Sequence, residues 1–407
     1  MALYHKGTKR SSLVCLRGLH GVRPEETARI GIQHETGVEM AKKILYCAST
    51  RSHILNFHLP YLKAFHERGY EVWVAVNKEA PVPNADHVIA LPIRKKFFSL
   101  QNAKAVLQAR KLIRKQKFDL VSTHTELASA VVRAAILLLR KRPKVVCTVH
   151  GYLFNETTGL RKWVYLIPEK LCARVTDVLM VMNREDYEIA RRHRLCRGRL
   201  CRIDGMGIDL AKFYPATSEE RTSAREKLEI GKDDFAFVYA AEFSKRKNQA
   251  FLIHAFADIC RENPRMKLLL AGDGALAEDC KALVRQLRVQ EEIRFPGYVE
   301  NMRKLYAACD VCVSASRIEG LPFNIMEAMA CGLPVIASDI KGHRELTLDG
   351  KIGLLFRDAA ELKDQMGKLL LDDGLRNILR EAGLLQVKEF ALPKVIPAIM
   401  ERYRPFP

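Results

Sequence analysis

The chain has 407 residues, of which 67 are Lys or Arg and 47 are Asp or Glu, giving a formal net charge of +20; 48% of the residues are hydrophobic. This length and apolar fraction exclude a disordered chain and predict two or three compact domains. The excess of positive charge indicates an anionic partner, which could be nucleic acid, a membrane surface or a phosphorylated ligand.

The eleven cysteines indicate a reducing compartment. Their number is odd and they have no paired framework spacing, so we expect reduced, mostly buried thiols in a cytoplasmic protein. Cys309 and Cys312 have C-x-x-C spacing, and His193, Cys196 and Cys201 form a loose cluster. Neither group has the further partners that a four-ligand zinc site needs, which favours core packing.

No segment reaches the ~18 uninterrupted apolar residues that span a bilayer, and no signal peptide is expected. Residues 1–39 show no strong periodicity, whereas the sequence after Met40 is typical of the first strand of an α/β domain. We therefore expect residues 1–39 to be a poorly ordered leader, arising from an upstream start or as an expression artefact.

From residue 42 onward, short apolar runs alternate with amphipathic stretches. Strands are expected at residues 43–48, 71–76, 120–123, 145–149 and 178–182, and helices at 60–68, 103–116 and 128–140. This repeating order predicts a parallel, doubly wound sheet that binds its ligands at the carboxyl ends of the strands.

The pattern restarts after a polar stretch at residues 216–225. New strands are expected at residues 235–240, 267–271, 293–295, 311–314 and 334–337. We therefore predict an α/β fold of two Rossmann-like domains facing each other across a cleft. The expected boundaries are 40–212 for the N-terminal domain and 213–390 for the C-terminal domain, with 391–407 crossing back to the N-terminal domain as a helix.

The positive charge belongs almost entirely to the N-terminal half. Residues 40–215 contain 32 basic and 14 acidic residues, a balance of +18, whereas residues 216–390 contain 26 and 28, a balance of −2. The densest runs, at 94–117, 133–144 and 191–202, contain no acidic residue. A single run could be a solvated helix face, but three runs in one domain, beside a neutral second domain, favour a functional face.

The most informative stretch runs from Ser314 to Ser338. Pro322 can begin a helix that ends before Gly332, and this helix would direct free backbone N–H groups at the cleft, as diphosphate binding requires. Glu319 and Glu327 flank the same anion site. Carboxylates beside a diphosphate would be repelled unless they bind hydroxyl groups, so we interpret both as ligands of sugar and ribose.

The spacing E-x7-E, within E-G-x-P-x-x-x-x-E-A-M-A-x-G-x-P-V, resembles the signature of retaining GT-B glycosyltransferases of glycosyltransferase family 4. The nearest likeness is to a bacterial subgroup from capsule and exopolysaccharide clusters. The resemblance implies that Glu327 hydrogen-bonds the nucleotide ribose and that Glu319 lies at the donor sugar. It places the backbone of four residues at the sugar and diphosphate: Gly320, Leu321, Pro322 and Phe323.

Other positions match the family one by one. Lys247 matches a lysine that neutralises the leaving diphosphate, whereas Glu242 stands where an arginine is expected. The second cation could then be Arg246 or Lys245. Three residues in strand-end turns are expected near the nucleotide, although turn formation alone would explain the two glycines: Gly272, Gly274 and Tyr298.

Four histidines are candidates for the cleft. His150 ends a strand before Gly151, and the resemblance places it beside the donor sugar. His124 also ends a strand, and the stretch containing His53 and His58 resembles the same bacterial subgroup. We expect these three further histidines on the acceptor side, although a lone histidine is more often structural.

No D-x-D triplet occurs in the chain. A divalent ion that stabilises a departing nucleoside diphosphate needs carboxylates to hold it. We therefore expect no metal and no other cofactor, with Lys247, nearby cations and the helix N-terminus supplying the electrostatic stabilisation.

The resulting prediction is a retaining, metal-independent hexosyltransferase in which His150, Glu319 and Lys247 are catalytic. It would move a sugar from a nucleotide diphosphate donor, expected to be UDP-linked, to a saccharide or lipid-linked saccharide in polysaccharide biosynthesis. The basic domain would bind the inner face of an anionic membrane. Two alternatives remain: a sugar-nucleotide epimerase or hydrolase of the same fold, and a nucleic-acid-binding protein, whose expected aromatic interleaving is lacking.

Overall fold

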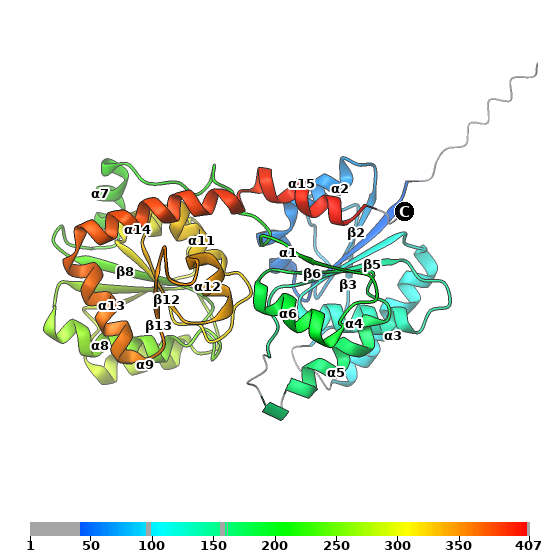
Figure 1. Ribbon diagram of the computed structural model, residues 1–407, viewed down its shortest axis with the longest axis horizontal. Helices are drawn as coiled ribbons and strands as arrows, with labels where there is room; N and C mark the ends of the chain where they lie inside the picture. Colours follow the sequence, from blue (N-terminus) through cyan, green and yellow to red (C-terminus); the bar gives the residue numbers. More distant parts are fainter. Residues whose placement is uncertain (1–40, 95–98, 155–158, 161, 405–407) are drawn as a thin grey trace, which may run out of the picture. The chain divides into compact units, whose positions relative to one another are not determined.

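The computed structural model describes residues 41–94, 99–154, 159–160 and 162–404. The predicted leader at 1–39 lies outside the described residues. Two parallel β-sheets follow one another along the chain (Figure 1).

The first sheet has seven strands in the order β3-β2-β1-β4-β5-β6-β7, and all its neighbouring strands are parallel. Its strands are β1 (Lys43–Cys47), β2 (Glu71–Val76), β3 (His87–Ala90), β4 (Leu120–His124), β5 (Lys144–Val149), β6 (Val178–Val181) and β7 (Arg199–Arg202). The central strands are nearly continuous apolar runs because helices cover both of their faces.

Within the described residues, six helices accompany this sheet. They are α1 (Arg51–Phe57), α2 (Leu59–His66), α3 (Leu100–Gln116), α4 (Glu126–Leu137), α5 (Lys162–Ala173) and α6 (Arg184–His193). Helices α3, α4 and α5 lie on one side of the sheet and α2 lies on the other (Figure 1). Successive right-handed crossovers produce such a layered arrangement.

The second sheet has six parallel strands in the order β10-β9-β8-β11-β12-β13. Its strands are β8 (Phe235–Ala240), β9 (Met266–Ala271), β10 (Ile293–Gly297), β11 (Val311–Ser314), β12 (Val335–Ser338) and β13 (Leu354–Phe356). Its helices are α7 (Ser218–Lys227), α8 (Gln249–Glu262), α9 (Ala277–Leu287), α10 (Met302–Ala308), α11 (Phe323–Ala330), α12 (Lys341–Thr347), α13 (Ala359–Leu371) and α14 (Asp373–Gln386). The predicted fold class, an α/β chain with two Rossmann-like parallel sheets, is confirmed.

The last segment returns to the first sheet. After α14 come a 3₁₀ turn (Val387–Phe390) and α15 (Leu392–Arg402), which packs against α2. The backbone of Ile208 bonds to Phe390 and Leu392 at 2.8 and 3.0 Å, and the hydroxyl of Tyr403 lies 2.7 Å from that of Ser122 in β4.

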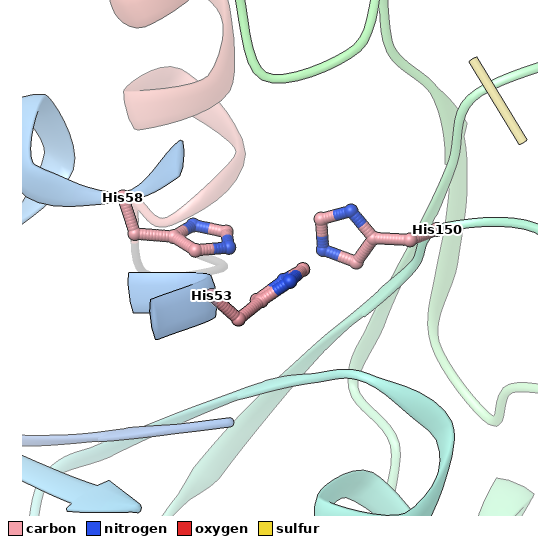
Figure 2. Close-up of side chains that lie close together, drawn as sticks. All are labelled: His53, His58 and His150. Carbon is pink, nitrogen blue, oxygen red and sulfur yellow. The ribbon is translucent and has the colours of Figure 1, made fainter. Parts of the chain in front are cut away.

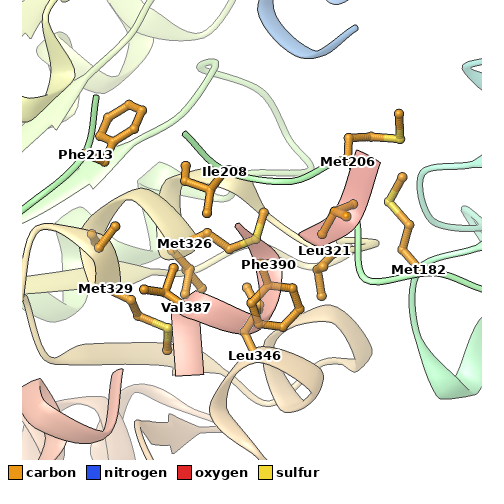
Figure 3. Close-up of a cluster of buried hydrophobic side chains, with 14 of the residues drawn as sticks. Met182, Met206, Ile208, Phe213, Leu321, Met326, Met329, Leu346, Val387 and Phe390 are labelled. Carbon is orange, nitrogen blue, oxygen red and sulfur yellow. The ribbon is translucent and has the colours of Figure 1, made fainter. Parts of the chain in front are cut away.

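One cluster of buried apolar side chains contains residues of both halves. Met182 and Met206 belong to it together with Leu321, Met326 and Phe390 (Figure 3). Because these side chains pack in one cluster, the two sheets are parts of one packed unit.

Polar contacts reinforce this packing. Lys341 donates to Oδ1 of Asp186 at 2.5 Å and to the backbone oxygen of Tyr152 at 2.9 Å, and Asn183 Nδ2 donates to the backbone oxygen of Gly320 at 3.0 Å. Both partners of the Lys341–Asp186 ion pair are buried, so loss of one partner would leave an uncompensated charge.

The cysteines behave as the sequence predicted. Ten of the eleven lie in the described residues, all are unpaired, and nine of these ten are buried. Within the described residues, no helix combines the length and apolar character needed to cross a bilayer.

Candidate active site

A cleft of about 1260 Å³ is lined by residues of both halves of the chain. Its walls are the loops and helix starts that follow the carboxyl ends of the parallel strands, where ligands of such sheets bind. Of the residues predicted from the sequence, twelve line it: His53, His150, Arg246, Lys247, Gly272, Tyr298, Glu319, Gly320, Leu321, Pro322, Phe323 and Glu327.

Glu319 is buried and bound by two cations. Its Oε1 accepts from Lys247 Nζ at 2.6 Å and from Ser316 Oγ at 2.7 Å, and its Oε2 accepts from Arg246 Nη1 at 3.0 Å. Burial alone would raise the pKa of Glu319, but Lys247 and Arg246 outweigh this effect and lower it to about 2. The carboxylate is therefore ionised at every pH at which the protein is expected to work.

The two cations come from the loop between β8 and α8. The backbone N–H of Lys247 bonds to the oxygen of Ser244 at 3.0 Å, and Arg246 Nη1 also donates to the backbone oxygen of Ile318 at 3.1 Å. Of the two candidates for the missing arginine, Arg246 is the one that reaches the cleft beside Lys247. Both cations are paired with Glu319, which the sequence did not predict.

Glu327 lies in α11, whose N-terminus faces the cleft. Tyr306 donates its hydroxyl to Oε2 of Glu327 at 3.0 Å. Burial raises the pKa of Glu327 from its ordinary value of 4.5 to about 7, although Tyr306 and Lys212 oppose the shift. A carboxyl that titrates near neutrality inside a cleft is typical of a functional group.

The start of α11 has unsatisfied donors. Pro322 is the N-cap residue and provides no side-chain cap, so the first backbone N–H groups of the helix have no partner from that residue. The Nδ2 of Asn324, which also lines the cleft, is buried without a hydrogen-bond partner. Such orphaned donors at a helix N-terminus suit an anionic ligand.

Of the three residues predicted in strand-end turns, Gly272 and Tyr298 line the cleft and Gly274 does not. Gly272 lines the cleft with φ at +134°, and a Cβ there would lie 2.3 Å from the oxygen of Ala241. Gly274 is not among the cleft residues; a Cβ there would lie 2.4 Å from the oxygen of Phe243. Close backbone packing therefore explains Gly274.

The structure brings all four candidate histidines together. His53, His58 and His150 point toward a common centre, with ligand nitrogens within 4.8 Å of one another (Figure 2). His124 lies behind them, with its Nδ1 3.4 Å from Nε2 of His150. The register of β4 with β5 produces this meeting, because His124 pairs with Thr148, two residues before His150.

The four histidines form two layers. His53 and His150 line the cleft, whereas His58 and His124 are fully buried and do not. Tyr46 bonds to Nδ1 of His58 at 2.8 Å, and Ser122 bonds to Nε2 of His124 at the same distance. His58 and His124 therefore support the two cleft histidines from inside the protein, and their place on the acceptor side stays a prediction.

Burial keeps the cluster uncharged. It lowers the pKa of His53 to about 4 and moves the pKa values of the other three histidines well below their ordinary range. The Nε2 atoms of His53 and His58 are buried without a partner. Neutral imidazoles with free nitrogens can accept hydrogen bonds or ligate zinc.

In the described part of the chain, one group of possible metal ligands is found: His53, His58 and His150. Neither the Cys309–Cys312 pair nor the residues His193, Cys196 and Cys201 belong to such a group, as the sequence predicted. Three imidazoles without a carboxylate suit zinc better than the magnesium or manganese that binds a diphosphate. The absence of a required metal stays a prediction.

Several charged residues of the cleft were missed in the sequence, among them Arg133, Glu169 and Glu126. Arg133 Nη2 donates to Glu169 Oε1 at 2.6 Å, and Arg133 is fully buried. Glu126 begins α4, and burial followed by the charge of Glu169 raises its pKa to about 8. The sequence did contain a signal for Glu126, because it is an acidic residue two places after the strand end at His124.

Two protein-family models match the chain. The model described as "Glycosyltransferase Family 4" matches residues 61–212, and that described as "Glycosyl transferases group 1" matches residues 220–386. Together they cover every strand of the two sheets except β1.

Two curated relatives are similar over most of their length. One is EpsD of Bacillus subtilis (strain 168), which is named as a glycosyltransferase. It is 34% identical over 365 residues, which cover 86% of this chain and 96% of EpsD. The UDP-Gal:alpha-D-GlcNAc-diphosphoundecaprenol alpha-1,3-galactosyltransferase of Escherichia coli is 30% identical over 261 residues, which cover 63% of this chain and 67% of that protein.

Solved structures share the fold. Sucrose-phosphate synthase (tll1590) from Thermosynechococcus elongatus has a TM-score of 0.73 at 22% identity, covering 89% of this chain and 98% of its own. Anabaena Alr3699/HepE in complex with UDP-glucose has a TM-score of 0.70 at 20% identity, covering 89% and 99%. Both likenesses concern the two-domain GT-B architecture.

Proposed function

The chain belongs to glycosyltransferase family 4, and on this basis we propose that it moves a sugar from a UDP-sugar to a lipid-linked saccharide, with retention at the anomeric carbon and without a metal ion. The observation that carries the proposal is the grouping of Glu319, Lys247, Arg246 and Glu327 around the N-terminus of α11 in one cleft. The reaction would belong to polysaccharide biosynthesis.

The donor would lie against the second sheet. The diphosphate would meet the free N–H groups at the start of α11 and the side-chain amide of Asn324, both suited to an anion. Glu327 would accept hydrogen bonds from the ribose hydroxyls. The E. coli relative acts on UDP-Gal by its name, which supports a UDP-linked donor here.

Lys247 and Arg246 would stabilise the leaving diphosphate. Both already lie within 3.0 Å of a carboxylate, so their charges are held in a partly buried site where electrostatic effects are strong. A diphosphate carries more negative charge than Glu319, and could share the two cations with it. This arrangement accounts for how departure of the nucleotide could proceed without a divalent ion.

Front-face attack is the retaining mechanism that we favour. A covalent intermediate needs a free carboxylate nucleophile at the anomeric carbon. Both oxygens of Glu319 are engaged by Lys247, Ser316 and Arg246, so Glu319 is a poor nucleophile. The acceptor hydroxyl would instead attack from the side of the departing phosphate and pass its proton to a phosphate oxygen.

The acceptor would lie over the first sheet, beside His53 and His150. Their neutral imidazoles can bind hydroxyl groups of either sugar without attracting a phosphate away from the cations. Glu126, on the same side of the cleft, could accept a further hydroxyl. The E. coli relative names a diphosphoundecaprenol acceptor, which supports a lipid-linked substrate and a membrane surface for this basic half.

A donor panel tests this function. Purified protein is incubated with UDP-, GDP- and dTDP-sugars, with and without a bacterial membrane extract, and released nucleotide is measured together with labelled lipid. Release of UDP and labelling of lipid that both need the extract support the proposal. Release of free sugar alone, or formation of an epimer, would contradict it.

A further inference from the structure

Helix α5 exposes an apolar stripe. Trp163, Val164, Ile167 and Leu171 are 43%, 46%, 52% and 49% exposed. At 100° per residue these positions fall within an arc of about 100°, so they form one continuous face. Four large apolar side chains on one exposed face of a single helix indicate an interaction surface rather than scattered surface residues.

The opposite face of α5 is fixed to the protein. Leu166, Cys172 and Ala173 are buried, and α5 packs against α4 (Figure 1). From this side α5 also supplies Tyr165 and Glu169 to the cleft. The helix therefore has one apolar side for the core and a second for a partner outside the described chain.

The charges around the stripe are positive. Lys170 and Arg174 are exposed near its C-terminal end, on either side of Leu171 in the sequence, and Lys162 Nζ lies 5.9 Å from the ring centre of Trp163. Glu169, the acidic residue of α5, is directed inward to Arg133. Helix α3, which packs on α4, adds six basic residues and no acidic residue between 99 and 117.

We propose that α5 docks on an anionic lipid bilayer, with the stripe inserted among the headgroups and the cations at its edge bound to lipid phosphates. An apolar face with Trp, flanked by Lys and Arg, is the pattern of helices that lie in a membrane interface. The inference deepens the proposed function and rests on it in one respect: because Tyr165 and Glu169 of α5 line the cleft, docking would bring its acceptor side to the lipid surface.

The test measures binding to vesicles without any substrate. A triple variant, Trp163→Gln, Ile167→Gln and Leu171→Gln, is compared with the unchanged full chain on vesicles of phosphatidylglycerol and phosphatidylcholine. The matched control changes three exposed apolar residues of the other half: Leu371→Gln, Ile378→Gln and Leu385→Gln. We expect at least tenfold weaker binding for the α5 variant and no change for the control, with thermal unfolding of both variants close to that of the unchanged protein.

The chain contains its own probe of insertion. Of its two tryptophans, Trp73 is buried and Trp163 is exposed. Binding to vesicles should shift the fluorescence emission to shorter wavelength, brominated lipids should quench it, and Trp163→Phe should abolish both effects while retaining most of the binding.

Three results would overturn the proposal. The α5 variant could bind vesicles as well as the unchanged chain, the control variant of Leu371, Ile378 and Leu385 could lose as much vesicle binding as the α5 variant, or the emission of Trp163 could stay unshifted on bound protein. A change of sedimentation by the α5 variant without vesicles would instead identify a second copy as the partner. The vesicle assay contains no donor or acceptor, so it reports on docking alone. Sugar transfer is measured separately with an acceptor dispersed in detergent, and failure of docking is therefore distinguishable from failure of transfer.

Discussion

Gly151 and Gly320 lie in backbone contact across the cleft. A Cβ on Gly151 would lie 2.6 Å from the nitrogen of Gly320, and a Cβ on Gly320 would lie 2.1 Å from the oxygen of His150. Gly151 also has φ at +116°, which side chains disfavour. Two glycines therefore join the strand end of His150 to the loop of Glu319.

We expect Gly320→Ala to separate these two segments. Because both near atoms are backbone, neither can move aside cheaply, and a displacement of about 1 Å in a catalytic site can cost about 100-fold in rate. Transfer rate and thermal unfolding should both fall. The control, Gly367→Ala in α13, has nothing within 4 Å of the added methyl group and should raise stability by up to about 1 kcal/mol. Full activity of Gly320→Ala would refute the role of the contact.

Lys247→Met should lower kcat by about 100- to 1000-fold, since it removes one of the charges placed at the leaving diphosphate. Lys245→Met, an exposed neighbour in the same loop, is the matched control and should retain activity. The measurement is steady-state release of nucleotide with saturating donor. Equal effects of the two changes would count against a specific role for Lys247.

Glu327→Gln should weaken donor binding by about 10- to 100-fold, because hydrogen bonds to a charged acceptor contribute about 1.5–3 kcal/mol. The dissociation constant of UDP at pH 8 is the direct measurement, with exposed Glu381→Gln as the control. Unchanged affinity would remove the ribose role of Glu327.

The pKa of Glu327 predicts a pH dependence. Its folded value of about 7 lies above its ordinary 4.5, so the carboxyl is protonated below neutrality and becomes a full acceptor only as the pH rises through 7. UDP affinity should increase between pH 6 and 8 in the unchanged protein and stay flat in Glu327→Gln. The same raised pKa means that this group stabilises the folded protein less as pH rises from 4.5 to 7 and beyond, so Glu327→Gln should increase the unfolding temperature more at pH 8 than at pH 5.

Much of the fold was predictable because its signals are local. The strands at 71–76, 235–240 and 311–314 coincide with β2, β8 and β11, since buried parallel strands are continuous apolar runs. The strands β3, β7 and β13 were missed. β7 has the sequence Arg-Leu-Cys-Arg inside a basic run. Because it is an edge strand and half exposed, it lacks the apolar run by which buried strands are predicted.

The site was predictable only where a motif carried it. Glu319, Glu327 and Lys247 belong to such motifs and line one cleft. The pairing of both cations with Glu319 and the buried Arg133–Glu169 ion pair join residues 36 to 73 positions apart. The burial of His58 and His124 likewise depends on the folded chain around them. Such contacts arise from strand register and helix packing, which single-sequence patterns do not encode.

Removal of metals should leave transfer intact. We expect EDTA to change the rate by less than twofold, because Lys247, Arg246 and the start of α11 would carry the stabilisation of the diphosphate. Loss of activity with EDTA, restored by Mg²⁺ or Mn²⁺, would contradict a metal-independent reaction. Restoration by Zn²⁺ alone would point to the group of His53, His58 and His150.

The most direct test of the account is the product itself. Purified protein, a UDP-sugar and a diphosphoundecaprenol-linked saccharide are combined in EDTA, and the lipid product is examined by mass spectrometry and by NMR of the new anomeric carbon. The account predicts a lipid enlarged by one sugar whose anomeric configuration matches that of the donor. An unmodified lipid with every active donor, or an inverted linkage, would contradict it.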